Sequence, residues 1–208
     1  ILAFNKAIAE AAKARGLNAS TCHSLGNGAF YGAGLRPRLN KWKVRDMLPH
    51  AMPANQQATL EKLVSLCKAN MLDGTNPTEL DALVLTYGID TNGDAQDLFA
   101  RVPELLARCR ADTKQIDFDD MIWLPVVLGL TPRRYDVVMV DESQDLNHAQ
   151  QELCFMTIGT DSPSPSPRQP GGLYVPSRTE QGRLITVGDD RQSIYAFRGA
   201  DSDAMQRM

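Results

Sequence analysis

Residues 135–147 read YDVVMVDESQDLN, and this stretch decides the fold class. Its first part, residues 135–140, is mainly apolar and predicts a strand that is buried on both faces of a parallel sheet. Asp141 and Glu142 follow at once, so two adjacent acids would lie at the carboxyl end of that strand. A nucleotide-hydrolysing site needs one carboxylate to hold hydrated magnesium and a neighbour to orient the attacking water. We therefore predict that Asp141 holds magnesium and that Glu142 is the general base.

Other short strands flank this one in the sequence. Residues 184–187, LITV, predict a second buried strand that also ends in acids, and residues 1–4 predict a third. Asn5 is placed to cap a helix that runs to Arg15, where Gly16 would stop it. Residues 17–21 predict a further strand that ends in polar side chains. Because open α/β sheets bind ligands at the carboxyl ends of their strands, these ends are the candidate site.

The middle of the chain has a helical pattern. Between about residues 53 and 128, apolar residues recur at spacings of three and four. We therefore expect an α/β fold with a helical insertion, divided into residues 1–28, 29–115 and 116–208. Residues 161–182 are rich in Pro, Ser and Gly and predict a mobile surface loop.

Composition narrows the function only slightly. The 208 residues are 43% hydrophobic and 23% charged, which is typical of a globular protein, and a net charge of −3 gives no general attraction to nucleic acid. The four cysteines are widely spaced and indicate neither a zinc site nor a disulfide framework. No apolar run has membrane-spanning length and no export signal is evident, so we expect a cytoplasmic protein, or a nuclear one in a eukaryote.

One basic cluster and two histidines lie outside these patterns. The cluster could contact DNA backbone or could equally be a solvated face; it comprises Arg36, Arg38, Lys41, Lys43 and Arg45, with Trp42 between them. His50 and His148 have no plausible metal partners nearby in the sequence, so we interpret them as structural.

Four segments together carry a family resemblance. They are AFNKAIAEAA from residue 3, STCHSLG from residue 20, VMVDESQDLN from residue 138 and VGDDRQSIYAFRGAD from residue 187. The last two are long and specific, whereas the first two gain weight from their order along the chain. The set resembles the UvrD/Rep/PcrA-type superfamily 1 DNA helicases. The resemblance implies a RecA-like sheet, ATP and Mg²⁺ as cofactors, and single-stranded DNA and single-strand/duplex junctions as partners.

The resemblance also implies residue roles. Gln192 would sense the γ-phosphate, and Arg198 would tie the DNA surface to the nucleotide site; both would contact the cofactor region together with Asp141 and Glu142. Phe197 stands where many relatives carry Trp, and an aromatic ring gives a base a stacking face. The implied DNA-binding residues are Phe4, Asn5, Lys6, Thr21, His23, Ser24, Tyr195 and Phe197. Gln144 and Asp145 would link the magnesium site to the DNA-facing segments.

One motif of the family does not occur. No Gly-x-x-x-x-Gly-Lys-Ser/Thr loop, which cradles phosphates, is found in the 208 residues. In the family this loop lies just before the strand that opens this chain. We therefore expect a partial RecA-like P-loop NTPase sheet, without its first strand and phosphate loop, in a chain cut at both ends and inactive by itself.

Three functions stay open at this stage. The first is a fragment of an ATP-dependent helicase that moves 3′ to 5′ on single-stranded DNA and unwinds duplexes. The second is the motor part of a RecB-like helicase–nuclease. The third is a non-catalytic DNA-binding module, which would apply if the chain were complete.

Overall fold

The computed structural model describes residues 1–3, 5–159, 182–189 and 208. The protein divides into two compact units. The first combines Ile1–Arg36 with the described part of Met121–Met208, and the second is Pro37–Asp120. The second unit is therefore one continuous insertion between two parts of the first. The subdomain boundaries expected from the sequence, after residues 28 and 115, stay predictions.

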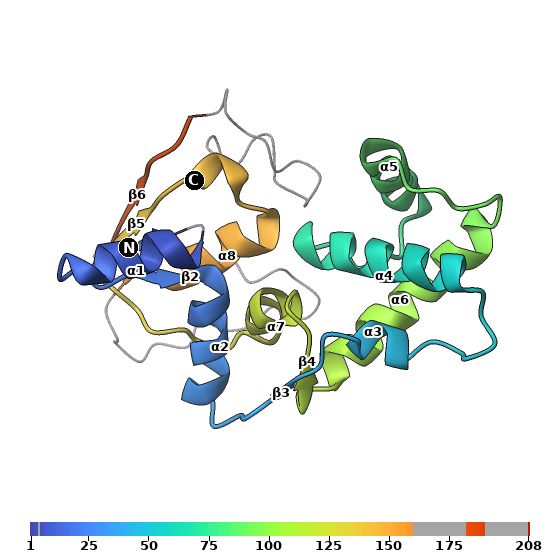
Figure 1. Ribbon diagram of the computed structural model, residues 1–208, viewed down its shortest axis with the longest axis horizontal. Helices are drawn as coiled ribbons and strands as arrows, with labels where there is room; N and C mark the ends of the chain where they lie inside the picture. The colour runs from blue at the N-terminus through green and yellow to red at the C-terminus, as the bar shows by residue number, and fades with distance from the viewer. Residues whose placement is uncertain (4, 160–181, 190–207) are drawn as a thin grey trace. The chain divides into compact units, whose positions relative to one another are not determined.

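A four-stranded parallel sheet lies at the centre of the first unit (Figure 1). Its strands are β1 (Leu2–Ala3), β2 (Ser20–Thr21), β5 (Val137–Val140) and β6 (Arg183–Thr186), in the order β2-β1-β5-β6. Every described pairing between them is parallel. The predicted α/β class with a parallel sheet is confirmed, and all four strands end at the same edge.

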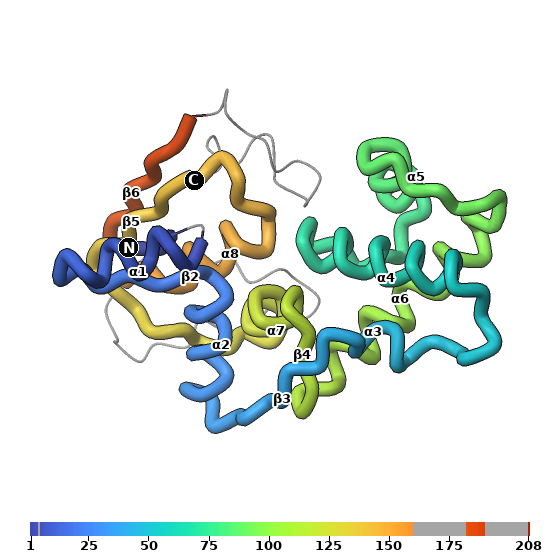
Figure 2. The backbone as a smooth tube through the Cα atoms, in the orientation of Figure 1, coloured from blue at the N-terminus to red at the C-terminus, as the bar shows by residue number. Residues whose placement is uncertain are grey.

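Helices connect these strands, and several begin with side-chain caps. Figure 2 shows the backbone passing from β1 through α1 (Lys6–Ala14) to β2, and then into α2 (Cys22–Gly32). Asn5 caps α1 as predicted, and Gly16 follows the helix with a φ of 79°. After β5 come a short 3-10 helix, η1 (Ser143–Asp145), and α8 (His148–Met156), which begins with a capping box.

Helix α2 packs very closely on the start of α7 (Asp120–Leu128). A Cβ atom built on Gly26 would lie 1.8 Å from the carbonyl oxygen of Met121 and 3.4 Å from Leu153. Only a residue without a side chain fits at this contact, because an atom cannot approach a carbonyl to 1.8 Å. Gly26 thus sets how closely α2 approaches the chain at Met121.

Strand β5 differs from its prediction in one respect. Val138 and Val140 are buried, but Val137 and Met139 are 51% and 40% exposed. In the described residues the strand is thus covered on one face only, whereas its run of apolar residues predicted burial on both faces. The apolar run identified the strand correctly, but the neighbours that cover each face cannot be read from the strand itself.

The second unit is mainly helical. It contains β3 (Arg38–Leu39), α3 (Lys43–Asp46), α4 (Ala54–Ala69), α5 (Pro77–Tyr87), α6 (Ala95–Ala111) and β4 (Gln115–Ile116). Strands β3 and β4 form a short parallel pair that the helical pattern did not predict. The predicted spacing does mark the core, in which Leu60, Leu63, Leu80, Leu98 and Val102 are almost inaccessible to solvent.

A buried ion network also lies in the second unit. Lys43 Nζ is 2.6 Å from Asp120 Oδ2, and Lys68 Nζ is 2.8 Å from Asp120 Oδ1 and 2.6 Å from Asp117 Oδ2. The Lys43 ammonium also donates to two backbone carbonyls at the end of α6, at 2.9 and 3.0 Å. The network joins α3 and α4 to Asp117, which follows β4, and to Asp120, the first residue of α7.

The cysteines and the hydropathy of the helices complete the description of the fold. All four cysteines are buried free thiols. No helix in the described part of the chain has both the length and the apolar character that crossing a membrane requires.

Candidate active site

Asp141 and Glu142 follow β5 directly, at the edge where the four strands end. The Asp141 amide donates to Leu2 O at 3.1 Å, so the ladder between β1 and β5 continues up to the acid. Both acidic side chains are half-buried. The sheet therefore fixes the Asp141 backbone, and both side chains stay partly accessible to solvent, as a site for a hydrated cation and a water molecule requires.

Glu142 has an unusual backbone conformation. Its φ of 52° and ψ of 44° lie in the left-handed region, which costs a residue with a side chain roughly 1–2 kcal/mol. Glycine would adopt this conformation without that cost. Strained residues of this kind gather at functional sites, where the side chain has to point in one direction. The turn thus holds Glu142 in a conformation that Met71 and Asn92 are the other described non-glycine residues to adopt.

Gln144 joins the acidic turn to the end of β6. Its Nε2 donates to Glu142 Oε2 at 2.7 Å, and its Oε1 accepts from the Asp189 amide at 3.2 Å. The Ser143 amide next to it donates to Val187 O at 3.0 Å. Two segments more than forty residues apart in sequence thus meet beside the candidate base.

Strands β1 and β2 also end at this sheet edge, and a polar segment follows each of them. Asn5 Oδ1 accepts from the Ile8 amide at 3.0 Å, and Thr21 Oγ1 accepts from the Ser24 amide at 3.2 Å. Each side chain is thus an N-cap, a local role that the sequence predicted only for Asn5. The structure therefore brings the ends of β1 and β2 to the same edge as Asp141 and Glu142.

A model of the UvrD/REP helicase N-terminal domain matches residues 4–208. The chain belongs to this family. The UvrD/Rep resemblance inferred from the sequence is thereby confirmed, and the parallel α/β sheet agrees with a RecA-like helicase N-terminal domain.

Individual relatives of this UvrD/REP-family chain are DNA helicases by name. ATP-dependent DNA helicase UvrD1 of Mycobacterium tuberculosis (strain ATCC 25618 / H37Rv) is 38% identical over 119 residues, which cover 51% of the chain and 14% of that protein. ATP-dependent DNA helicase Rep of Escherichia coli K12 is 26% identical over 208 residues, 90% of the chain and 27% of Rep. The chain spans about a quarter or less of these relatives.

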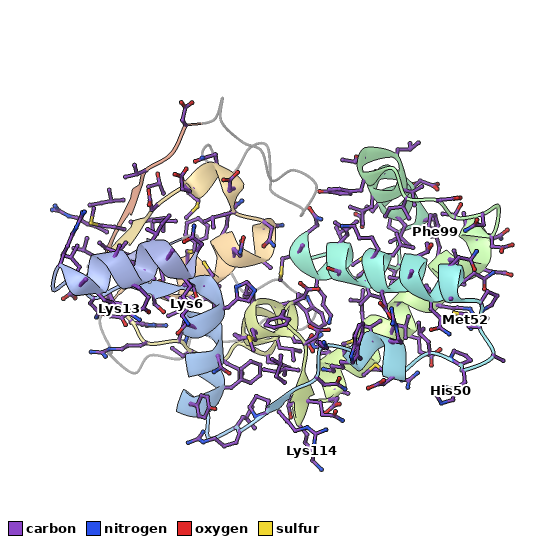
Figure 3. All side chains as sticks on the ribbon, in the orientation of Figure 1. Lys6, Lys13, His50, Met52, Phe99 and Lys114 are labelled. Carbon is purple, nitrogen blue, oxygen red and sulfur yellow. The ribbon has the colours of Figure 1, made fainter. Side chains whose placement is uncertain are left out.

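Lys6, His23 and Ser24 are exposed residues of the UvrD/REP-family chain. Lys6 lies in the first turn of α1, and Figure 3 shows it on the same helix as Lys13. Neighbouring protein atoms partly desolvate the His23 imidazole, which lowers its pKa even though the residue as a whole is exposed.

Several sequence-predicted residues lie outside the described residues. They are Phe4, Gln192, Tyr195, Phe197 and Arg198. Their roles stay predictions from the family resemblance.

The carboxylates at the sheet edge suit magnesium better than they suit a metal ion that needs three or more protein ligands. Among the described residues, no group of three His, Cys, Asp or Glu side chains is arranged to hold a metal ion. Magnesium does not need such a group, because it keeps several waters and binds through one or two carboxylates. A half-buried Asp141 next to Glu142 meets that requirement.

The basic cluster at residues 36–45 is not one charged face. Lys43 is 2% exposed and its ammonium lies in the buried ion network, so it cannot contact DNA. The interpretation of Lys43 as a surface charge is therefore wrong. Trp42 remains 47% exposed, with Lys41 Nζ 4.9 Å and Arg45 Cζ 4.6 Å from its ring centre.

A pocket of about 260 Å³ lies elsewhere in the first unit. Its walls include Leu2, Ser20, Tyr135 and Val137, so it adjoins the beginnings of β2 and β5. Asp141 and Glu142 follow the opposite end of β5 and do not line the pocket. Ser24, a predicted DNA-binding residue, lines the pocket, but both acids lie outside it, so the candidate magnesium site is an open sheet edge and not this cavity.

Proposed function

We propose that the chain is part of an ATP-dependent DNA helicase that couples hydrolysis of Mg-ATP to movement on single-stranded DNA and to duplex unwinding. The observation that carries this proposal is Glu142, which stands beside Asp141 at the end of β5 in a strained left-handed conformation. Support comes from the relatives, which are named ATP-dependent DNA helicases.

In this proposal Asp141 and Glu142 have different roles in ATP hydrolysis. Bound magnesium would neutralise phosphate charge. Asp141 would hold the ion through its water shell, and Glu142 would orient the attacking water and take its proton. Gln192 would contact the γ-phosphate and Arg198 would join the nucleotide site to the DNA surface, as the resemblance implies.

The DNA side of the proposal uses the neighbouring strand ends. Phe4, Tyr195 and Phe197 would supply aromatic faces for bases, and Lys6 would contact a phosphate. The remaining contacts would come from polar groups near the two N-caps, namely Asn5, Thr21, His23 and Ser24. Preference for single-strand/duplex junctions and movement from 3′ to 5′ belong to the proposal through the family resemblance.

The proposal assigns catalysis to the complete gene product. The 208 residues contain no Gly-x-x-x-x-Gly-Lys-Ser/Thr loop, so the chain by itself should hydrolyse ATP negligibly. Turnover by the isolated chain that Glu142→Gln abolished would contradict this point.

The main test compares two isosteric substitutions in the complete gene product. Glu142→Gln removes the base and should lower DNA-stimulated ATP turnover at least about a hundredfold, as expected for a lost general base. Glu104→Gln removes a charge from an exposed position in the second unit and should leave turnover unchanged. Equal turnover of Glu142→Gln and the unsubstituted protein would refute the assignment of the base.

A further inference from the structure

The sequence contains two Asn-Gly pairs, at residues 27–28 and 92–93. An asparagine before glycine is prone to lose its side-chain amide, because the glycine nitrogen attacks the side-chain carbon without hindrance from a side chain of its own. The attack requires the asparagine backbone and side chain to rotate, and it requires the glycine amide to be free of hydrogen bonds. The local structure at each pair therefore decides whether the reaction occurs in the folded protein.

The first pair lies inside α2. Helical geometry fixes the backbone of Asn27 and engages the Gly28 amide in an intrahelical hydrogen bond. The neighbouring side chains of Leu25 and Phe30 are buried, so the helix is also held by packing. Attack on the Asn27 side chain therefore requires α2 to open locally and to lose this packing.

The second pair lies at the tip of the connection between α5 and α6. Asn92 has a φ of 52° and Gly93 a φ of 84°, and both residues are exposed. Two consecutive left-handed residues form the tight turn that Asn-Gly favours, and the Asp94 amide closes it by donating to Thr91 O at 3.0 Å. In the described part of the chain, no group accepts a hydrogen bond from the Gly93 amide. The attacking nitrogen is therefore exposed and available.

The ends of this connection are held against α4. Thr59 Oγ1 donates to Asp90 O at 3.0 Å, and Gln56 Nε2 donates to Asp94 Oδ2 at 2.7 Å. At the tip, the Asn92 amide donates to Asp90 Oδ1 at 2.8 Å, and this bond is exposed to solvent. The tip can therefore change conformation by opening exposed hydrogen bonds of the turn, without disturbing the packed core of the second unit.

We propose that Asn92 is a site of spontaneous modification, at which the exposed turn before α6 allows asparagine to become isoaspartate or aspartate. In the first step the Gly93 nitrogen forms a bond to Asn92 Cγ. The bond from Cγ to Nδ2 breaks, and the amide group leaves as ammonia with the proton from the Gly93 nitrogen. Water then opens the resulting succinimide ring at either of its two carbonyl carbons. Water is the co-reactant, and no group is oxidised or reduced.

The modification changes both the charge and the length of the connection before α6. Either product places a new carboxylate near Asp90 and Asp94, and like charges at short separation repel. Isoaspartate also adds one carbon atom to the main chain between the two ends that α4 holds. Its free carboxylate is a substrate for enzymes that methylate isoaspartyl groups with S-adenosylmethionine. The inference is independent of the proposed function, because it uses no residue of the candidate active site.

The test incubates the complete gene product at mildly alkaline pH and compares residues 27 and 92 in the same sample. Digestion at acidic pH, where the reaction is slow, and mass spectrometry then quantify the modified peptides. The same protein unfolded in urea gives the intrinsic rate of each pair. Asn92 should react within about tenfold of its unfolded rate, because exposed loops open at little cost in free energy. Asn27 should react at least about a hundredfold more slowly than when unfolded, because a packed helix has to open first.

A substitution and an enzymatic probe confirm the position. A purified isoaspartyl methyltransferase with labelled S-adenosylmethionine should label the peptide that contains residue 92. Asn92→Gln keeps an amide but would have to close a larger ring, so this peptide should lose the label. Equal protection of Asn27 and Asn92 in the folded protein would overturn the inference. Label that persisted on this peptide in Asn92→Gln would overturn it as well.

Discussion

Lys43 and Asp120 form an ion pair inside the second unit, with 2.6 Å between Nζ and Oδ2 and side chains that are 2% and 0% exposed. The two residues are 77 positions apart in sequence. Removing one partner of a buried pair is costly, because the other charge stays desolvated without full compensation.

Lys43→Met should therefore destabilise the second unit by about 3 kcal/mol, the low end for a broken buried pair because Lys68 still faces Asp120. Amide hydrogen exchange of peptides from residues 37–120 in the complete gene product measures this local stability. Lys41→Met is the control, because Lys41 is exposed, and its exchange should match that of the unsubstituted protein. Equal protection in both variants would show that the network adds no stability.

Asp119 gives the second unit a pH dependence. Burial, with repulsion from Asp117, raises the Asp119 pKa, while a hydrogen bond from Ser65 and the charge of Lys68 oppose the rise. A raised pKa in the folded state means that folding favours the protonated acid. The contribution of Asp119 to stability is therefore fully present below its unfolded pKa and is lost as pH rises through its folded pKa.

Asp119→Asn should accordingly stabilise the second unit at pH 7 by about 0.5–1 kcal/mol, since it removes a desolvated charge. The gain should shrink as pH falls toward the ordinary range of a carboxyl group. Hydrogen exchange corrected for intrinsic rates at each pH measures the difference. Asp81→Asn, at an exposed position of α5, serves as the control. A gain that stayed constant with pH would argue against titration of Asp119.

Two of the three glycines of α2, Gly26 and Gly28, should respond oppositely to substitution by alanine. Gly26→Ala would place Cβ 1.8 Å from Met121 O and should destabilise the first unit by about 2–3 kcal/mol. Gly28 has nothing within 4 Å of its Cβ position, so Gly28→Ala should stabilise α2 by up to about 1 kcal/mol. Hydrogen exchange of the α2 amides measures the stability of both variants. If the two substitutions changed stability equally, the close contact at Gly26 would be disproved.

The strain at Glu142 predicts a difference between two variants that both lack the carboxylate. Glu142→Gly relieves the left-handed conformation, whereas Glu142→Ala keeps it. The Glu142→Gly variant should therefore be more stable than the Glu142→Ala variant by about 1 kcal/mol. Amide hydrogen exchange of residues 137–147 measures this difference. Both variants should lose ATP turnover. Equal stability would show that the turn relaxes when the side chain is removed.

Lys6 and Lys13 lie on one helix and should differ in DNA binding (Figure 3). If Lys6 contacts a phosphate, Lys6→Ala should reduce the slope of log K against log salt by about 0.7 for a single strand. Lys13, which pairs with Glu10 at 3.0 Å, should leave the slope unchanged when replaced by Ala. Fluorescence anisotropy over a salt series measures both, and equal slopes for the two variants would remove Lys6 from the DNA contact.

Much of the fold could be predicted because its signals are local. Asn5 caps the helix that follows it, and apolar spacing marks Leu60 and Leu63 as core. The acids after β5 could be placed at a sheet edge for the same reason, since a strand and the residue that follows it are covalent neighbours. The parallel pair β3–β4 was missed, because strands of two residues leave almost no pattern.

The sequence by itself determined the family, the four strands of the parallel sheet, the helical middle of the chain, and the presence of Asp141 and Glu142 at a strand end. Only the tertiary structure decided that Lys43 is a buried ion partner, that Val137 and Met139 are exposed, and how Glu142 is held. The physical reason is range. Capping and periodicity act between residues a few positions apart, whereas burial, ion pairing and the hydrogen bond of Gln144 with the Asp189 amide depend on segments that meet only when the chain is packed.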